Sequence, residues 1–294
     1  MRSRVIDAHV HLYPPETNAD PAGWAAARGE AHWSKLATRR RRSGRPVQTF
    51  PSLKELLASM DAANIERAVL QGWYWEDPRT CLEQNRFYRD CLRAHPDRIA
   101  ACVSLHARMA EGQLEAELVW ARDSGFRGVG ELSPHSQGYG LDHPGLEAAL
   151  SLAGEWGWPV VLHVSDPAGR GYPGRVETPL EDFLALAGNF PKTAFVLAHW
   201  GGLLALRPGA GRHRNLYYDT AASPLLYEPT VWRRIADAAG ADRILFGSDF
   251  PLNVFPGLEA EPGWDRLLAE ARSAGLPPGE LAAVLGGNAE RWFG

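Results

Sequence analysis

Short apolar runs recur along the chain, and longer segments with helical periodicity separate them. The runs span residues 4–12, 66–73, 98–106, 127–132, 159–164, 193–200, 215–220 and 242–250. They show little alternation of polar and apolar residues, which is typical of strands covered on both faces. The segments 52–65, 144–157, 179–190 and 230–240 carry apolar residues at helical spacing, and Ser52 is a typical N-cap. Strands alternating with helices predict a parallel (β/α)₈ barrel with right-handed crossovers.

Two segments depart from this pattern. Residues 13–51 form a long insertion loop after the first strand, and it contains the basic run "RRRRSGR" at 39–45. This run has two interpretations, a solvated loop or a site for an anionic partner, and the acidic balance elsewhere favours the loop. The tail 277–294 predicts one or two short helices that close the barrel. The 294 residues suit one distorted barrel domain over 1–294, because such barrels commonly need about 250 residues.

The first apolar run contains titratable residues at every second position. In "IDAHVHL", residues 6–12, strict strand alternation places Asp7, His9 and His11 on one face. The intervening apolar residues then face the other way. A face with two imidazoles packs poorly in a core but is a good start for a metal site.

Further ligand-type side chains lie where other predicted strands end. In barrels of this class the chemistry sits at the carboxyl ends of the strands. His163, His199 and Asp249 end the fifth, sixth and eighth runs, and His106 ends the third. Imidazole nitrogens and carboxylate oxygens are typical ligands of Zn²⁺, Mn²⁺ and Fe²⁺. The sequence therefore predicts a divalent metal site, with zinc as the first candidate ion.

Several motifs together give the chain a family resemblance. "DAHVHL", "VVLHV", "VLAHWGG", "LFGSDFP" and the closing "GNAERWFG" resemble the amidohydrolase superfamily. The likeness is greatest to its amidohydrolase-related branch, which also contains metal-dependent decarboxylases of the aminocarboxymuconate-semialdehyde and resorcylate type. The resemblance implies a distorted (β/α)₈ barrel with one metal held by His9, His11, His163 and Asp249. It also implies that His199 ligates a second metal or binds substrate.

The end of the fourth run departs from some members of that superfamily. The lysine that some of them carbamylate to bridge two metals is absent, and "GVGELSPH" places Glu131 there. A carboxylate also presents two oxygens to two cations, so Glu131 is a candidate bridging ligand. Two alternatives remain open, a salt bridge to a residue such as Arg127 or a hydrogen bond from a ligating histidine.

These residues predict a metal-dependent hydrolase that acts on a small lactone, amide or ester. Metal-activated water would attack the carbonyl carbon, Asp249 would shuttle the proton, and His199 or a second metal would stabilise the oxyanion. Asp7 would either orient a ligand or make an ordinary buried hydrogen bond. The first alternative is a non-oxidative decarboxylase that uses one metal on the same scaffold and acts on a small carboxylic acid, aromatic acids included. A TatD-type nuclease is disfavoured by the lack of a basic stripe, and a metal-loaded binding module without turnover would have no use for Asp249.

Loops after two strands suggest substrate contacts. Trp73 and Trp75 follow the second run and suit an aromatic or apolar substrate body, whereas Arg170 and Tyr172 follow the fifth and suit an anionic or polar end. Packing is the alternative role for all four, and His135 and Gln137 are further candidates with the same ambiguity.

Composition limits the partners and the location. Apolar residues make up 45% and charged residues 22% of the chain, and the net charge of −4 disfavours a nucleic-acid partner. Cys81, Cys91 and Cys102 form no disulfide or zinc pattern, and no apolar run reaches the roughly 18–20 residues of a membrane span. We expect a cytoplasmic enzyme with a small-molecule substrate, no nucleic-acid or membrane partner, and a homodimer as the assembly to test.

Overall fold

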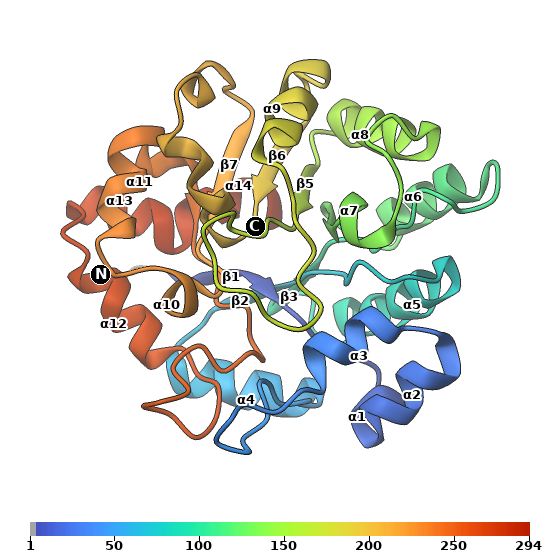
Figure 1. Ribbon diagram of the computed structural model, residues 1–294, viewed down its shortest axis with the longest axis horizontal. Helices are drawn as coiled ribbons and strands as arrows, with labels where there is room; N and C mark the ends of the chain where they lie inside the picture. Colours follow the sequence, from blue (N-terminus) through green and yellow to red (C-terminus); the bar gives the residue numbers. More distant parts are fainter. Residues whose placement is uncertain (1–3) are drawn as a thin grey trace.

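The predicted strands form a distorted barrel in the computed structural model, which describes residues 4–294 (Figure 1). The strands are β1 Ile6–Val10, β2 Arg67–Leu70, β3 Ile99–Ala101, β4 Val129–Leu132, β5 Pro159–Leu162, β6 Ala194–Leu197, β7 Leu216–Asp219 and β8 Ile244–Leu245. All neighbouring strands pair in parallel. Each lies within one of the eight apolar runs, so the prediction of a (β/α)₈ fold is confirmed.

The barrel closes through two isolated backbone bridges. Regular pairing gives a sheet β1-β2-β3 and a sheet β4-β5-β6-β7-β8. A parallel bridge between Val103 and Val129 joins β3 to β4, and another between Val10 and Phe250 joins β1 to the segment after β8. The distortion therefore lies at these two seams, where the ladders are shortest.

Helices surround the strands in Figure 1. The longer ones are α4 Leu53–Ala63, α5 Pro78–Ala94, α6 Gln113–Asp123, α8 Pro144–Trp156, α9 Leu180–Asn189, α11 Val231–Ala239 and α12 Asp265–Ser273. The shorter ones are α1 Pro15–Ala19, α2 Pro21–Arg28, α3 Ala31–Ala37, α7 Pro134–Gln137, α10 Ser223–Leu226, α13 Pro278–Ala282 and α14 Asn288–Phe293. Short 3₁₀ segments lie at His199–Leu206, Ala210–Arg212 and Ala241–Arg243, and a π-helical turn lies at Ala283–Gly287. The four helices predicted at 52–65, 144–157, 179–190 and 230–240 are confirmed to within two residues, and Ser52 and Glu55 form a capping box at the start of α4.

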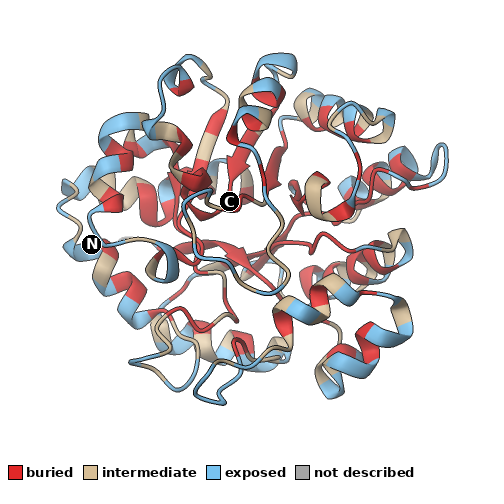
Figure 2. Ribbon diagram, in the orientation of Figure 1, coloured by how far each residue is buried: buried red, intermediate tan, exposed pale blue. Residues whose placement is uncertain are grey.

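Apolar side chains fill two layers of the barrel. Inside it, Ile6, Ala8, Val69, Val161 and Val196 pack against Ala289 and Phe293 of α14. Outside it, a larger cluster joins the opposite faces of the strands to the helices. The strands at the centre of Figure 2 are accordingly mostly buried, and exposed residues lie mainly on the outer sides of the surrounding helices and on the loops. The C-terminal helix thus closes the barrel end opposite the strands' carboxyl ends.

The insertion is more ordered than the sequence suggested. Residues 13–51 contain α1, α2 and α3 rather than only a loop. The basic run follows α3, where Arg40 and Arg42 are exposed and Arg41 donates to the carbonyl of Asn253. The helices escaped prediction because each is shorter than two and a half turns, which is too short for a helical repeat to stand out in the sequence.

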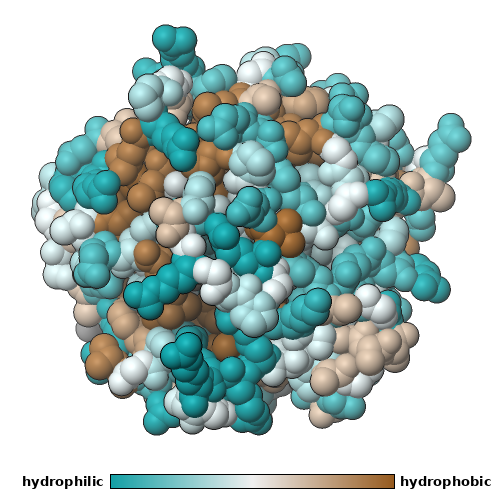
Figure 3. Space-filling model, in the orientation of Figure 1, coloured by the Kyte–Doolittle hydropathy of each residue, from teal (hydrophilic) through white to brown (hydrophobic). Residues whose placement is uncertain are grey.

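The surface, the cysteines and the lengths of the helices carry little information about binding partners. Figure 3 shows mixed hydrophilic and hydrophobic side chains on the face turned to the viewer. Cys81, Cys91 and Cys102 are buried free thiols. Within residues 4–294, no helix is both long and apolar enough to cross a membrane.

His106 gives a testable pH dependence of stability. It is 2% exposed, and burial together with Arg108 lowers its pKa to about 4. Between pH 6.5 and pH 4 the unfolded chain therefore takes up a proton that the folded chain does not, so stability falls as the pH falls. His106→Asn retains an acceptor for the Arg108 N–H, which bonds to Nδ1 of His106. We expect this variant to lose on the order of 1 kcal/mol less stability than the wild type between pH 7.5 and pH 5, as measured by urea unfolding.

The matched control is His95→Asn, which changes a partly exposed histidine at the end of α5. It should lose as much stability as the wild type over this pH range. Equal losses for His106→Asn and the wild type would contradict the assignment.

Candidate metal centre

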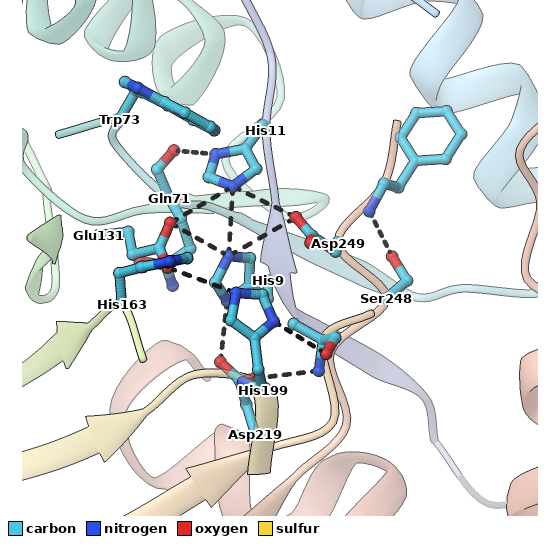
Figure 4. A network of polar contacts seen from close by, with 12 residues as sticks. His9, His11, Gln71, Trp73, Glu131, His163, His199, Asp219, Ser248 and Asp249 are labelled. Carbon is cyan, nitrogen blue, oxygen red and sulfur yellow. Dashed lines mark hydrogen bonds and ion pairs between the residues drawn. The ribbon is translucent and has the colours of Figure 1, made fainter. Parts of the chain in front are cut away.

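A bulge in β1 brings two histidines to the barrel mouth. Asp7 pairs with Ala68 and Val10 with Leu70, so an extra β1 residue lies between the two pairs. Ile6 and Ala8 consequently face the interior of the barrel, while Val10 packs in the outer cluster. His9 and His11 point into the site (Figure 4). The expectation that Asp7 shares their face is wrong, because the bulge shifts the alternation between Asp7 and His9.

A second bulge directs Glu131 into the same space. Val129 pairs with Val160 and Leu132 with Leu162, which leaves an irregularity around Gly130 and Glu131. Gly130 has φ +128°, and a Cβ there would lie 2.5 Å from the Val161 carbonyl oxygen. Only glycine fits such a position. Glu131 is 2% exposed and is not paired with Arg127, whose guanidinium instead bonds to the carbonyl of Phe126.

Six ligand-type side chains converge in two groups (Figure 4). The groups are His9, His11, Asp249 and Glu131, His163, His199, and within each the ligand atoms lie within 4.8 Å of one another. In the first group the Nε2 atoms of His9 and His11 are 3.2 Å apart, and Asp249 Oδ1 is 3.4 Å from His11 Nε2. The structure therefore brings together the six predicted metal ligands, whereas His106, the other histidine at the end of a predicted strand, belongs to neither group.

Glu131 belongs to the second group but also faces the first. Its Oε2 is 3.8 Å from His9 Nε2 and 3.7 Å from His11 Nε2. Its Oε1 is 2.9 Å from His163 Nδ1 and 3.9 Å from His199 Nε2. Each carboxylate oxygen thus faces a different pair of imidazole nitrogens.

Two of these side chains stand on strained backbone. His199 and Asp249 have φ +58° and +67°, in the left-handed region that non-glycine residues rarely adopt. The amide of Asp249 donates to the carbonyl of His9 at 2.9 Å, and Nδ1 of His199 bonds to the carbonyl of Ala221 at 3.0 Å. Strain maintained by such contacts is characteristic of functional sites.

Asp219 was missed by the sequence analysis. It ends β7, and its Oδ2 accepts from Nδ1 of His9 at 2.8 Å. Its Oδ1 accepts the backbone N–H of His199 at 3.0 Å. A carboxylate bonded to the far nitrogen of an imidazole orients the near nitrogen toward a metal. The signal was present, because an acidic residue ends the run "NLYYDT" just as Asp249 ends the eighth run.

Asp7 supports the centre from outside the barrel. Its Oδ1 accepts the backbone N–H groups of His9 and Ser248, each at 3.0 Å. Its Oδ2 accepts the Ser248 hydroxyl and the Trp264 indole N–H, each at 2.5 Å. The carboxylate therefore ties the backbone beside His9 to the residue before Asp249.

The charges of the centre favour the binding of a cation. Burial alone would raise the pKa of Glu131, but His163, His9 and His11 hold it well below its usual range. The pKa of Asp249 is likewise lowered, by His11, His9 and His199 against the effect of burial. Burial would lower the pKa of His9, whereas Asp219, Glu131 and Asp249 raise it to about 10. Buried carboxylates that stay ionised beside converging imidazoles fit the requirements of a divalent cation.

The predicted substrate residues lie in different places. Trp73 is beside His11, with ring centroids 5.2 Å apart (Figure 4). Trp75 is fully buried against Trp24 and Trp33, and the structure does not bring it to the ligands. Arg170 is exposed on the loop between β5 and α9. Tyr172 of that loop is half-buried beneath Arg39 of the insertion, whose guanidinium is 5.2 Å from its ring.

His135 and Gln137 are the two remaining substrate-contact candidates, and Tyr74 is a residue near the site that the prediction missed. Gln137 is buried and donates to the carbonyls of Trp75 and Leu105, and His135 bonds to Asp182, so both have structural partners. Tyr74, which the sequence analysis passed over, stacks on Trp73 at 4.5 Å and packs against His163 at 5.0 Å. The sequence analysis proposed the tryptophans on either side of Tyr74 as substrate contacts and did not consider Tyr74 itself.

Comparison with a family model places the chain in a known family. The amidohydrolase model, Amidohydro_2, matches residues 6–294. The chain belongs to the amidohydrolase family. This match confirms the resemblance noted from the sequence. The chain therefore belongs to a family of enzymes, and its fold is a barrel.

Solved structures of similar fold include enzymes of two reaction types. A 5-carboxyvanillate decarboxylase from Novosphingobium aromaticivorans, complexed with manganese and 4-hydroxy-3-methoxy-5-nitrobenzoic acid, is 16% identical with a TM-score of 0.75 and covers 99% of this chain and 96% of its own. A 2,6-dihydroxybenzoate decarboxylase from Rhizobium is 17% identical with a TM-score of 0.66 over 99% and 98%. A probable 2-pyrone-4,6-dicarboxylic acid hydrolase from Acinetobacter baumannii is 15% identical with a TM-score of 0.63 over 99% of each chain. At these identities the likeness shows the fold alone. Two of these three structures are decarboxylases, as in the alternative prediction, and none of the three confirms the predicted hydrolase.

The double substitution His9→Ala and His11→Ala tests the first ligand group. Removing two imidazoles whose Nε2 atoms are 3.2 Å apart should empty that group of metal. Elemental analysis of the purified protein should show the loss. The partly exposed His143→Ala is the control and should retain the wild-type content, and full content in the double variant would refute the assignment.

Asp219→Asn tests the role of the missed carboxylate. The amide keeps the size of the side chain but removes the charge that His9 Nδ1 faces at 2.8 Å. We expect metal affinity to fall by about 10–100-fold, the usual scale for such outer partners, in a competition titration with a chelator. Unchanged affinity would show that Asp219 serves only to hold the backbone.

Proposed function

We propose that the protein is a two-metal hydrolase of a small ester, lactone or amide. The observation that carries this proposal is the position of Glu131, whose oxygens face His9 and His11 on one side and His163 and His199 on the other. A carboxylate in that position suits a bridging ligand between two cations. The ligand groups on its two sides supply three and two further side chains, respectively.

The carboxylates of the centre have different roles in the proposed hydrolysis. Divalent ions held by them would supply Lewis-acid polarisation of a carbonyl and activation of water near neutral pH. Asp249, whose side chain is 13% exposed at the mouth, takes the proton from the attacking water as the new C–O bond forms. It returns that proton to the leaving oxygen or nitrogen as the scissile bond breaks. Asp219 and Asp7 keep His9, His199 and Asp249 oriented throughout.

Decarboxylation of a small aromatic acid is the second candidate. It is favoured by the decarboxylases among the structures of similar fold, one of which carries manganese. It is also compatible with the 2.9 Å contact between Glu131 and His163 Nδ1, which would persist if a single ion occupied only the His9, His11 and Asp249 group. The breaking of the carboxylate C–C bond would then leave an electron pair on carbon, and a histidine of the centre would protonate it.

Zinc and manganese are the two metals proposed for this centre. Zinc and manganese both accept imidazole and carboxylate ligands, and the carboxylate-bearing second group suits either ion. The substrate is a small molecule, because the ligand groups are buried within the barrel mouth.

Glu131→Gln separates the two candidates. Wild-type protein loaded with zinc or manganese should contain two ions per chain, and the variant one or fewer, because an amide cannot bridge with two anionic oxygens. Hydrolysis of a panel of aryl esters and lactones should fall by about 10²-fold or more. The exposed Glu147→Gln is the matched control and should change neither quantity.

One tightly bound ion in the wild type, unaffected by Glu131→Gln, would contradict the two-metal hydrolase. Release of CO₂ from 2,6-dihydroxybenzoate or 5-carboxyvanillate under those conditions would favour the decarboxylase. A fully loaded protein inactive toward every substrate of both panels would point to binding without turnover.

A further inference from the structure

One segment crosses the mouth of the barrel over the ligand groups. It is the loop between β5 and α9, residues 166–177, here called the strap, and in Figure 1 it runs in yellow-green over the centre of the barrel to α3. Its two ends meet at a neck. There the N–H of Ser165 donates to Oγ1 of Thr178 at 2.8 Å, and that hydroxyl donates to the carbonyl of Ser165 at 3.3 Å. A loop with joined ends is an Ω-loop, a form that is frequently functional.

The tip of the strap is held by the insertion. Nε2 of His32 in α3 donates to the carbonyl of Gly174 at 2.7 Å, and the guanidinium of Arg39 lies 5.2 Å from the ring of Tyr172. A Cβ built on Gly174 would lie 3.0 Å from the end of the Leu36 side chain, so α3 and the strap are in direct contact. One hydrogen bond, one cation–π contact and a small apolar contact are individually weak interactions. This latch can therefore open without unfolding the barrel.

The inner side of the strap lies against the second ligand group. Tyr172 shares a hydrogen bond with the Ser165 side chain, and Ser165 Oγ is 3.4 Å from Nε2 of His163. Tyr172 is also close enough to Asp249 to interact with its charge. The side chains of the six ligands are only 0–13% exposed. With so little of the ligands exposed, a substrate can reach ions held by them only after a covering segment moves.

Empty space at the neck gives the strap room to move. A cavity of about 250 Å³ lies beside the neck, and the chain that follows the strap forms its other wall. The residues that line it include Ser165, Pro167, Arg175 and Thr178 at the neck, together with Leu180 and Arg207. The strap can tilt into this space without displacing packed side chains, because no core residue fills it.

We propose that the strap is a lid that turns at its neck, between Ser165 and Thr178, and that the latch formed by His32 and Arg39 holds it closed over the metal ligands. Substrate enters and product leaves while the latch is open, and closure excludes bulk water during the reaction. This inference goes beyond the proposed function, because it applies equally to a hydrolase and to a decarboxylase, with one ion or two. It also gives the insertion at residues 13–51 a role, since the insertion carries one half of the latch.

A reversible cross-link tests the lid without a known substrate. In the double variant Lys35→Cys and Gly174→Cys the two Cβ atoms would lie 3.4 Å apart, close to the separation of about 3.8 Å in a disulfide. The full chain is loaded with zinc and then treated with oxidised glutathione. The probe is removal of the zinc by 1,10-phenanthroline, a flat chelator that must enter the mouth. We expect the oxidised variant to release zinc about tenfold more slowly than the reduced variant, and reduction by a phosphine to restore the faster rate.

The comparison of the two forms removes the effect of the substitutions themselves. Gly174 has φ +86°, so any side chain there is strained, but the strain is present in the oxidised and the reduced variant alike. Loss of stability would speed the release of zinc and cannot imitate a slower release. The control is wild-type protein treated with the same oxidant, whose three cysteines are buried and which should keep its release rate.

His32→Phe and Arg39→Met test the latch in the opposite direction. Phenylalanine keeps a ring beside Tyr74 but removes the hydrogen bond to the strap. Release of zinc to phenanthroline should become about fivefold faster, the equivalent of one net hydrogen bond. Arg39→Met should change the rate in the same direction. Its control is Arg40→Met, which removes an exposed guanidinium bonded to the carbonyl of Gly44 within its own loop and should keep the wild-type rate.

Equal release rates for the oxidised and reduced double variant, with the disulfide verified by mass spectrometry, would overturn the lid. Latch variants that release zinc no faster than Arg40→Met would do the same. Failure of the disulfide to form would show that the strap is not held against α3 and would also count against the proposal. Slower release in the oxidised variant of a protein with one ion, or with no hydrolase activity, would support the lid and reject only the two-metal hydrolase.

Discussion

The short backbone ladder between β1 and residues 246–250 is the interaction on which the barrel and its site depend. Ala8 donates to the carbonyl of Phe246, Asp249 to that of His9, and His11 to that of Phe250, at 2.7, 2.9 and 2.7 Å. These bonds join segments more than 230 residues apart and close the barrel at one seam. They also place His9 and His11 against Asp249. Asp7 strengthens the same seam, because its carboxylate accepts four hydrogen bonds, from His9 on one side, from Ser248 on the other and from Trp264 just before α12.

The charge buried at this seam constrains what the site can hold. Glu131 and Asp249 lie together in the barrel mouth, and the neighbouring imidazoles offset the cost of burying their charges. Asp219 lies behind them, where it accepts hydrogen bonds from His9 and from backbone N–H groups. Without added cations, the raised pKa of His9 keeps a proton on an imidazole that is otherwise a good metal ligand. A divalent ion would replace this proton and satisfy several carboxylate oxygens at once. The same arrangement explains why Asp219 is as much a part of the site as the residues it orients.

The strand pattern and the ligand set were predictable because both depend on local sequence. Apolar runs mark strands, and the ends of parallel strands meet at one edge of the barrel, so His163, His199 and Asp249 could be grouped before the structure was known. Bulges could not be predicted in this way. Alternation placed Asp7 beside His9, and only the irregular register of β1 separates them. Glu131 depends similarly on Gly130, and its spanning position between the two histidine groups follows from tertiary pairing with β5.

The insertion and the substrate loops were less predictable for another reason. Their conformation depends on contacts with one another, such as the bond from His32 Nε2 to the carbonyl of Gly174 and the stacking of Arg39 on Tyr172. Trp75 illustrates the limit, because an aromatic residue after a strand serves equally well in a core or at a substrate. A bridge by Glu131 between two ions can be seen by anomalous X-ray diffraction from crystals of the manganese-loaded protein. We expect two peaks, one among His9, His11 and Asp249 and one beside His163 and His199, with Glu131 between them. A single peak in the first group, with Glu131 still bonded to His163, would contradict it.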